Sequence, residues 1–130
     1  MSHLTAFHDS LELVAGRCED VVPPVYAALF ERYPEFEDLF VLDIDQGARG
    51  HMLNEALTMA EGLLRNDPVA IRFVSAERMN HAGYGIDDGV FDGFYCVMAD
   101  VFEAIGGPAW SPEMSAAWAA VTRAASFAKL

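Results

Sequence analysis

Apolar residues recur every three or four positions along most of this chain, and that spacing restricts the fold more than any other feature. Five such stripes begin at Phe7, Val22, Leu53, Phe91 and Met114. Helical spacing gives an α-helix one apolar face, whereas a half-buried β-strand needs strict alternation. No segment shows alternating β-branched residues around a tight turn. The sequence therefore predicts an all-α fold of about six helices.

The expected helix starts carry capping residues. Asp67-Pro68 and Ser111-Pro112 each place a capping side chain before a proline at the first helical position. Asp87 and Asp88 can cap the helix of the fourth stripe. Pro23-Pro24 fits only in the first turn of a helix, because a proline deeper inside would remove a backbone hydrogen bond. These signals place helix starts close to residues 22, 68, 88 and 112.

Length and composition limit the class of protein. The chain has 130 residues, of which 53% are apolar, and this predicts one folded domain over residues 1–130 and excludes intrinsic disorder. The net charge of −12 argues against nucleic acid or an anionic membrane as a partner. No apolar run is long enough to span a membrane. Because the first residues show no signal peptide and the two cysteines form no disulfide framework, a cytoplasmic location is expected.

Few residues outside the apolar stripes suggest a catalytic or ligand-binding site. The sequence contains none of the short motifs for phosphate binding, zinc-dependent hydrolysis or a nucleophilic serine. The segment 43–47 is only weakly similar to a calcium loop, because the later glutamate of such a loop is missing. Of the four histidines, His3 and His8 are expected at the surface. His81 lies near an expected helix end, where it is either a partner of the helix dipole or a metal ligand.

Three segments resemble, in the right order, parts of a known family. Residues 26–40 are similar to the second and third helices of a bacterial globin, with an aromatic residue, Leu-Phe, Pro-Glu and again Leu-Phe. Residues 81–86 resemble the segment of the proximal haem ligand, and residues 106–118 resemble the last turn and helix. The chain thus resembles a bacterial single-domain globin, similar to flavohaemoglobin-like proteins without their reductase. The resemblance implies a globin fold of about six to eight helices around a haem pocket.

The resemblance implies a role for each matching residue. His81 would be the axial iron ligand of haem b, which is iron protoporphyrin IX. Phe40 would pack flat against the porphyrin, while Leu53 and Leu57 would form apolar walls of the pocket. The Tyr26 hydroxyl would donate a hydrogen bond to bound oxygen, and a charge-assisted bond of this kind is worth about 1.5–3 kcal/mol.

The residue at the distal position over the iron has several candidates. Helical spacing back from Leu53 places Arg49 there, and Arg49 could instead reach a haem propionate. A shift of register by two or three residues places His51 or Met52 there. Either of these two side chains over the iron would make the resting haem six-coordinate. The sequence leaves these alternatives open.

Two departures from flavohaemoglobin-like globins bear on the expected function. Phe91 stands where those globins have a tyrosine, and their partner glutamate would lie beyond Leu130. Without that hydrogen-bonded pair, the proximal histidine donates less electron density to the iron, which argues against peroxidase-like chemistry. The resemblance therefore implies reversible binding of a diatomic gas, above all oxygen, with no catalytic residue.

Two alternative functions are also consistent with the sequence. One is nitric oxide dioxygenation on haem, which would need an external reductase as electron donor. The other is a haem-free globin fold that serves as a sensor or interaction domain. The sequence allows both a monomer and a homodimer.

Overall fold

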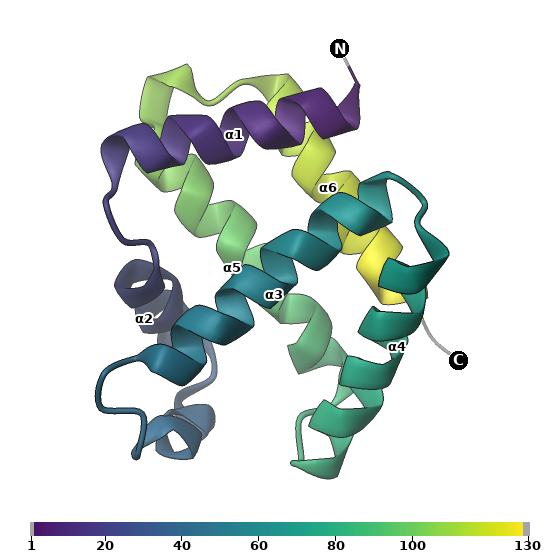
Figure 1. Cartoon of the computed structure of the whole chain (residues 1–130). Coiled ribbons are helices and arrows are strands. Elements are labelled where there is room, and N and C mark those ends of the chain that lie inside the picture. Colours follow the sequence, from purple (N-terminus) through teal and green to yellow (C-terminus); the bar gives the residue numbers. More distant parts are fainter. Residues whose placement is uncertain (1, 129–130) are drawn as a thin grey trace.

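Six α-helices and two short 3₁₀ helices make up the computed structural model, which describes residues 2–128 (Figure 1). Their bounds are α1 (His3–Arg17), α2 (Val22–Arg32), η1 (Pro34–Phe40), α3 (Gly47–Leu64), α4 (Pro68–Gly83), α5 (Asp88–Gly106), η2 (Gly107–Ala109) and α6 (Pro112–Phe127). No strand occurs between residues 2 and 128, so the all-α prediction is confirmed. Within the same range, no helix is long and apolar enough to cross a membrane.

The capping bonds confirm three of the predicted helix starts. The side chains of Asp67, Asp87 and Ser111 each accept a hydrogen bond from a backbone N–H in the first turn of α4, α5 and α6, at 3.0, 3.0 and 3.2 Å. Pro23 and Pro24 lie in the first turn of α2, as predicted. Because these bonds satisfy N–H groups that have no partner inside the helix, they fix where each helix begins.

The core lies where α1, α5 and α6 meet, and Trp118 is at its centre. Trp118 is 1% exposed, and its ring packs against Phe7 of α1 and Phe102 of α5 at centroid distances of 5.1 and 5.4 Å. Its Nε1–H donates to the buried Oγ of Ser10 at 2.9 Å, so the indole N–H is satisfied away from water. Figure 1 shows α1 crossing one end of α5 and α6, and α3 crossing α6 farther along.

The helices α3 and α4 pack closely where Gly62 faces Ala70. A Cβ atom at position 62 would lie only 2.5 Å from the Cβ atom of Ala70, which is 3% exposed. A glycine inside a helix normally costs about 0.5–1 kcal/mol relative to alanine. At this position any side chain would push α4 away from α3. The close approach therefore determines how α4 lies, and α4 carries His81 in its last turn.

We expect Gly62→Ala to destabilise the protein by about 1–3 kcal/mol, because overpacking outweighs the gain in helix propensity. Gly16→Ala in α1 is the matched control, since no atom lies within 4 Å of a Cβ placed there. Urea unfolding followed by circular dichroism measures the free energy of unfolding of both variants. A Gly62→Ala protein as stable as Gly16→Ala would contradict the close packing of α3 on α4.

Candidate functional site

A cavity of about 350 Å³ is lined by side chains of α2, η1, α3, α4 and α5. This volume lies within the range of roughly 300–1,000 Å³ that is typical of small-molecule sites. Most of the lining is apolar, and it includes five phenylalanines: Phe36, Phe40, Phe73, Phe91 and Phe94. The polar side chains in the lining are His51, Glu55, Glu77, His81 and Tyr95.

His81 lines the cavity from the last turn of α4, as expected of a proximal histidine. Its Nδ1 lies 2.7 Å from the carbonyl oxygen of Glu77, one turn earlier in the helix. A carbonyl oxygen only accepts hydrogen bonds, so Nδ1 carries the proton and donates it. In the neutral ring, Nε2 therefore keeps its lone pair and can bind a metal ion. The edge of the imidazole meets the ring of Phe91 at a centroid distance of 5.1 Å.

The face of α3 that lines the cavity carries His51, Met52, Glu55, Ala56 and Met59. Both His51 and Met52, two of the candidates for the distal position, are thus brought to the cavity. The His51 side chain is 75% exposed, with Nε2 at 3.8 Å from Oε1 of Glu55, whereas Met52 is half-buried. The sequence analysis missed Ala56 and Met59 as lining residues, although helical spacing from Met52 leads to both.

Arg49, the third candidate for the distal position, is not among the cavity-lining residues. Its Nε donates to Oδ2 of Asp43 at 3.1 Å, and its Nη2 donates to the carbonyl oxygens of Asp43 and Phe40 at 3.1 and 3.3 Å. The guanidinium carbon also lies 5.6 Å from the centroid of the Phe40 ring. These contacts hold the side chain against the loop before α3, and this is the physical reason why it does not reach the cavity.

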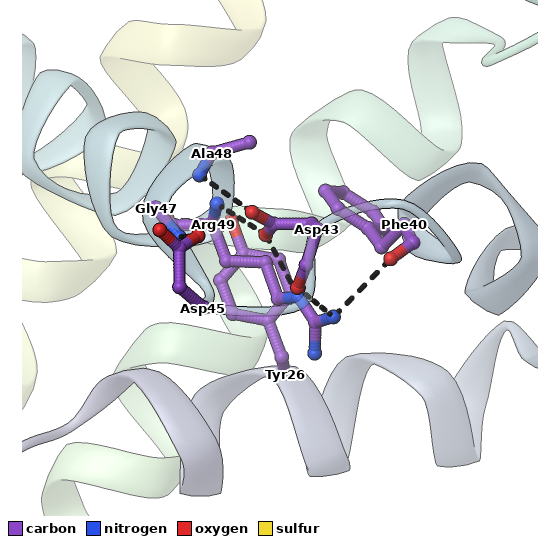
Figure 2. A network of polar contacts seen from close by, with 7 residues as sticks. All are labelled: Tyr26, Phe40, Asp43, Asp45, Gly47, Ala48 and Arg49. Carbon is purple, nitrogen blue, oxygen red and sulfur yellow. Dashed lines mark hydrogen bonds and ion pairs between the residues drawn. The ribbon is translucent and has the colours of Figure 1, made fainter.

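Asp43 caps the start of α3 from outside the helix (Figure 2). Its Oδ1 accepts from the N–H of Ala48 at 2.9 Å, and its Oδ2 accepts from the N–H of Arg49 at 3.0 Å. The hydrogen bond from Ala48, together with those from Arg49, lowers the pKa of the Asp43 carboxyl below its ordinary value. Gln46, the residue at the N-cap, has a φ of 61° and makes no capping bond with its side chain. Asp43 therefore performs the capping that Gln46 does not.

Tyr26 departs from its expected role as a hydrogen-bond donor to bound gas. Its hydroxyl donates to the carbonyl oxygen of Arg49 at 3.2 Å, and the residue is 2% exposed and does not line the cavity. Burial raises the pKa of this hydroxyl above its ordinary value, so it stays protonated at neutral pH. Tyr95 does line the cavity, but its hydroxyl donates to the carbonyl oxygen of Ala56 at 3.1 Å. Both hydroxyl groups thus donate their protons to backbone carbonyl oxygens of α3.

Of the residues expected to form apolar walls or to pack on the porphyrin, only Phe40 lines the cavity. Its ring lies against those of Phe30 and Tyr26, at centroid distances of 5.6 and 5.5 Å. Leu53 is 2% exposed in the hydrophobic core, and Leu57 is half-buried against that core. Both leucines belong to a face of α3 that packs inside the protein rather than against the cavity.

The globin family model matches residues 24–128, which is most of the chain. The chain belongs to the globin family. Comparisons with curated proteins and with solved structures give no match. The family match confirms the globin part of the resemblance, while the bacterial, flavohaemoglobin-like subtype stays a prediction.

Globins typically bind haem, and the donor set of this globin fits that cofactor on the side of His81. The ring offers an unprotonated nitrogen in the wall of an apolar cavity, which is what axial ligation requires. Glu55 and Glu77 also line the cavity, but their carboxylates are less suited than the imidazole of His81 to bind haem iron. No lysine or arginine of the described residues lines the cavity.

Asp43→Asn is expected to lower the melting temperature at neutral pH, because the amide NH₂ group replaces one oxygen that accepts from backbone N–H groups. The pKa of Asp43 is depressed in the folded state. Its stabilisation is therefore complete above the ordinary pKa of about 3.9 and is lost as the pH falls through the lower folded value. The difference from the wild type should be constant near neutral pH and shrink below about pH 4.

The matched control is Asp38→Asn, which removes the same charge from an exposed side chain. Calorimetric melting between about pH 7 and pH 3 compares both variants with the wild type. If Asp43→Asn melts like Asp38→Asn at neutral pH, or if its deficit stays constant down to the lowest pH, the capping role of Asp43 is wrong.

Proposed function

We propose that this globin binds haem b through His81 and reversibly binds a diatomic gas, with oxygen as the expected ligand. One observation carries the proposal. The hydrogen bond of 2.7 Å from His81 Nδ1 to the Glu77 carbonyl oxygen leaves Nε2 with a lone pair that can bind iron, on a residue that lines the cavity. When bound, haem supplies an iron atom to which gas can bind. The proposed unit is residues 1–130 as a single domain, of which residues 1 and 129–130 lie outside the described part.

The protein's own residues orient the histidine and keep water out of the cavity. The Glu77 carbonyl oxygen fixes the tautomer of His81, and a neutral acceptor makes the imidazole a weaker electron donor than a carboxylate acceptor would. The carboxylate of Glu77 does not take this place, because its Oε2 lies 3.8 Å from Nδ1, which is beyond hydrogen-bonding distance. The phenylalanines of the lining provide an apolar environment that excludes water.

These features support gas binding more than they support catalysis. Nitric oxide dioxygenation would need an external reductase and gains from a polar group beside the bound gas. The hydroxyl of Tyr26, which was expected to provide that group, donates to the Arg49 carbonyl oxygen instead. The proposed function is therefore reversible binding without a catalytic residue.

Reconstitution with haemin tests the role of His81. The wild-type protein is expected to show a Soret band that shifts on reduction and again under carbon monoxide. His81→Ala should lose the spectrum of a histidine-ligated haem, and added imidazole should restore it. His3→Ala is the matched control, because His3 is exposed and does not line the cavity. Equal losses in the two variants, or a wild-type protein that takes up no haemin, would contradict the proposal.

Tyr26→Phe is expected to destabilise the protein by about 1 kcal/mol, because the Arg49 carbonyl oxygen loses its buried donor. The rate of oxygen release should stay close to that of the wild type. If Tyr26 donated to bound oxygen, the loss of roughly 1.5–3 kcal/mol would speed release about tenfold to a hundredfold. Flash photolysis and urea unfolding measure the two quantities. Release that is about tenfold faster with unchanged stability would restore the original expectation for Tyr26.

One observation favours a second candidate function, that of a haem-free sensor or interaction domain. The cavity lining contains Glu55 and Glu77 but no cation from the described residues, so an anionic cofactor is repelled there. Titration with haemin at low and high salt concentration separates the two functions. A globin that binds haem against this repulsion should bind it more tightly as salt screens the charges. A wild-type protein that binds no haemin at any salt concentration would favour the haem-free function.

A further inference from the structure

Arg78 is a buried cation that the proposed function does not use. Among residues 2–128 it is the one charged residue that is buried as a whole, and its side chain is 6% exposed. It lies on α4, three residues before His81. Its Nη2 donates to Oδ1 of Asp92 at 2.7 Å, and its Nη1 donates to Oδ1 of Asp88 at 3.3 Å. The guanidinium therefore links α4 to the first two turns of α5.

The same guanidinium also reaches the end of α6. Its Nη2 donates to the carbonyl oxygen of Ala125 at 2.6 Å, and its Nε donates to that of Ala128 at 3.4 Å. The carbonyl oxygen of Ala125 also accepts from the N–H of Ala128, so the guanidinium is a second donor to it, and a cation at the end of a helix is favoured by the helix dipole. One side chain thus joins α4, α5 and α6 directly beside the turn that carries His81.

Arg78 also contacts the ring of Phe91, and Phe91 in turn contacts His81, which lines the cavity. The guanidinium carbon of Arg78 lies over the Phe91 ring, 4.8 Å from its centroid. The Phe91 ring in turn meets the His81 imidazole at a centroid distance of 5.1 Å and an interplanar angle of 72°. Because the guanidinium covers one face of Phe91 and the imidazole also contacts the ring, Phe91 has little freedom to rotate. Guanidinium, phenyl ring and imidazole are therefore in continuous contact, with the imidazole at a steep angle to the phenyl ring.

Burying a guanidinium costs desolvation free energy that an apolar side chain in the same space would not cost. Removing a charge from water costs free energy that an ion pair only partly recovers, and apolar side chains of similar volume often stabilise a protein equally well. The planar fork of arginine can, however, bind two carboxylates, two carbonyl oxygens and an aromatic face at once. No apolar side chain can fix the geometry of its neighbours in this way.

We propose that Arg78 is a positioning residue for His81, which fixes the orientation of the imidazole ring in the cavity wall by holding the ring of Phe91. The inference rests on the proposed function, because it takes His81 as the axial ligand. Flavohaemoglobin-like globins, which the chain resembles, have a tyrosine where this chain has Phe91. Phe91 has no hydroxyl group, and here it orients the ring by contact instead of by a hydrogen bond.

Resonance Raman spectroscopy of the reduced, haem-loaded protein measures the iron–histidine stretch, which depends on the orientation and hydrogen bonding of the imidazole. Arg78→Met is expected to shift and broaden this band, because Phe91 and the imidazole gain alternative orientations. Phe91→Leu leaves the ion pairs of Arg78 in place and is expected to shift the band as well. If both variants melt at lower temperature but keep the wild-type band, Arg78 only stabilises the fold and the proposal is overturned.

Arg65→Met is the matched control, because it removes the same charge from an exposed ion pair with Glu61 on α3. It should leave the band unchanged. Asp92→Asn weakens the shortest carboxylate contact of Arg78 and should also shift and broaden the band, so this variant tests the proposal if Arg78→Met does not fold. A band that keeps its wild-type frequency and width in both Asp92→Asn and Phe91→Leu would overturn the proposal.

The haem-free protein offers a test that does not depend on haem uptake. Nitrogen-15 NMR of the histidine side chains identifies the ring nitrogen that carries the proton. The wild type and Arg65→Met should show His81 protonated at Nδ1, because the ring is held against the Glu77 carbonyl oxygen. In Arg78→Met and Phe91→Leu the ring can turn away from this carbonyl oxygen, so a mixture of tautomers is expected. An unchanged tautomer in both of these variants would overturn the proposal. If the tautomers mix in the variants but the wild type binds no haemin, the positioning role stands and only the proposed function fails.

Discussion

The burial of Trp118 is the interaction on which the rest of the structure depends. Its indole ring contacts Phe7 and Phe102, and its N–H donates to Ser10, so one residue joins α1, α5 and α6 by packing and by a hydrogen bond. A buried aromatic side chain of this size provides much of the hydrophobic stabilisation in a small core. Because these three helices fill their shared interior, α2, α3, α4 and the first turns of α5 are free to surround a space that is not filled.

The cavity imposes a different requirement on the helices around it. Side chains that filled the cavity would stabilise the fold but would leave no room for a ligand. The walls are held apart instead by side-chain donors that bond to carbonyl oxygens of the backbone. Four side chains form bonds of this kind between different elements at or beside the cavity: Tyr26, Arg49, Arg78 and Tyr95. Directional bonds can hold a geometry that packing alone would close.

The sequence predicted the helices well because capping and periodicity are local properties. Its resemblance to globins also placed His81 and Phe40 at the cavity. The orientation of α3 could not be predicted, because spacing shows which residues share a face but not what that face contacts. This helix is apolar on two faces, so Leu53 was expected at the cavity where Met52 lies. The partner of the Tyr26 hydroxyl could not be predicted either, since it is a carbonyl oxygen of α3 and the backbone carries no sequence signal.

The bonds around the cavity join a particular side chain to a carbonyl oxygen that every amino acid provides. A substitution at an accepting position that is not fully buried, such as Ala56 or Glu77, leaves the acceptor in place as long as the helix is kept. A substitution at a donating position, such as Tyr95 or Arg78, removes the bond. Mutational tolerance around the cavity should therefore be asymmetric, with the donors far more constrained than the residues that accept from them.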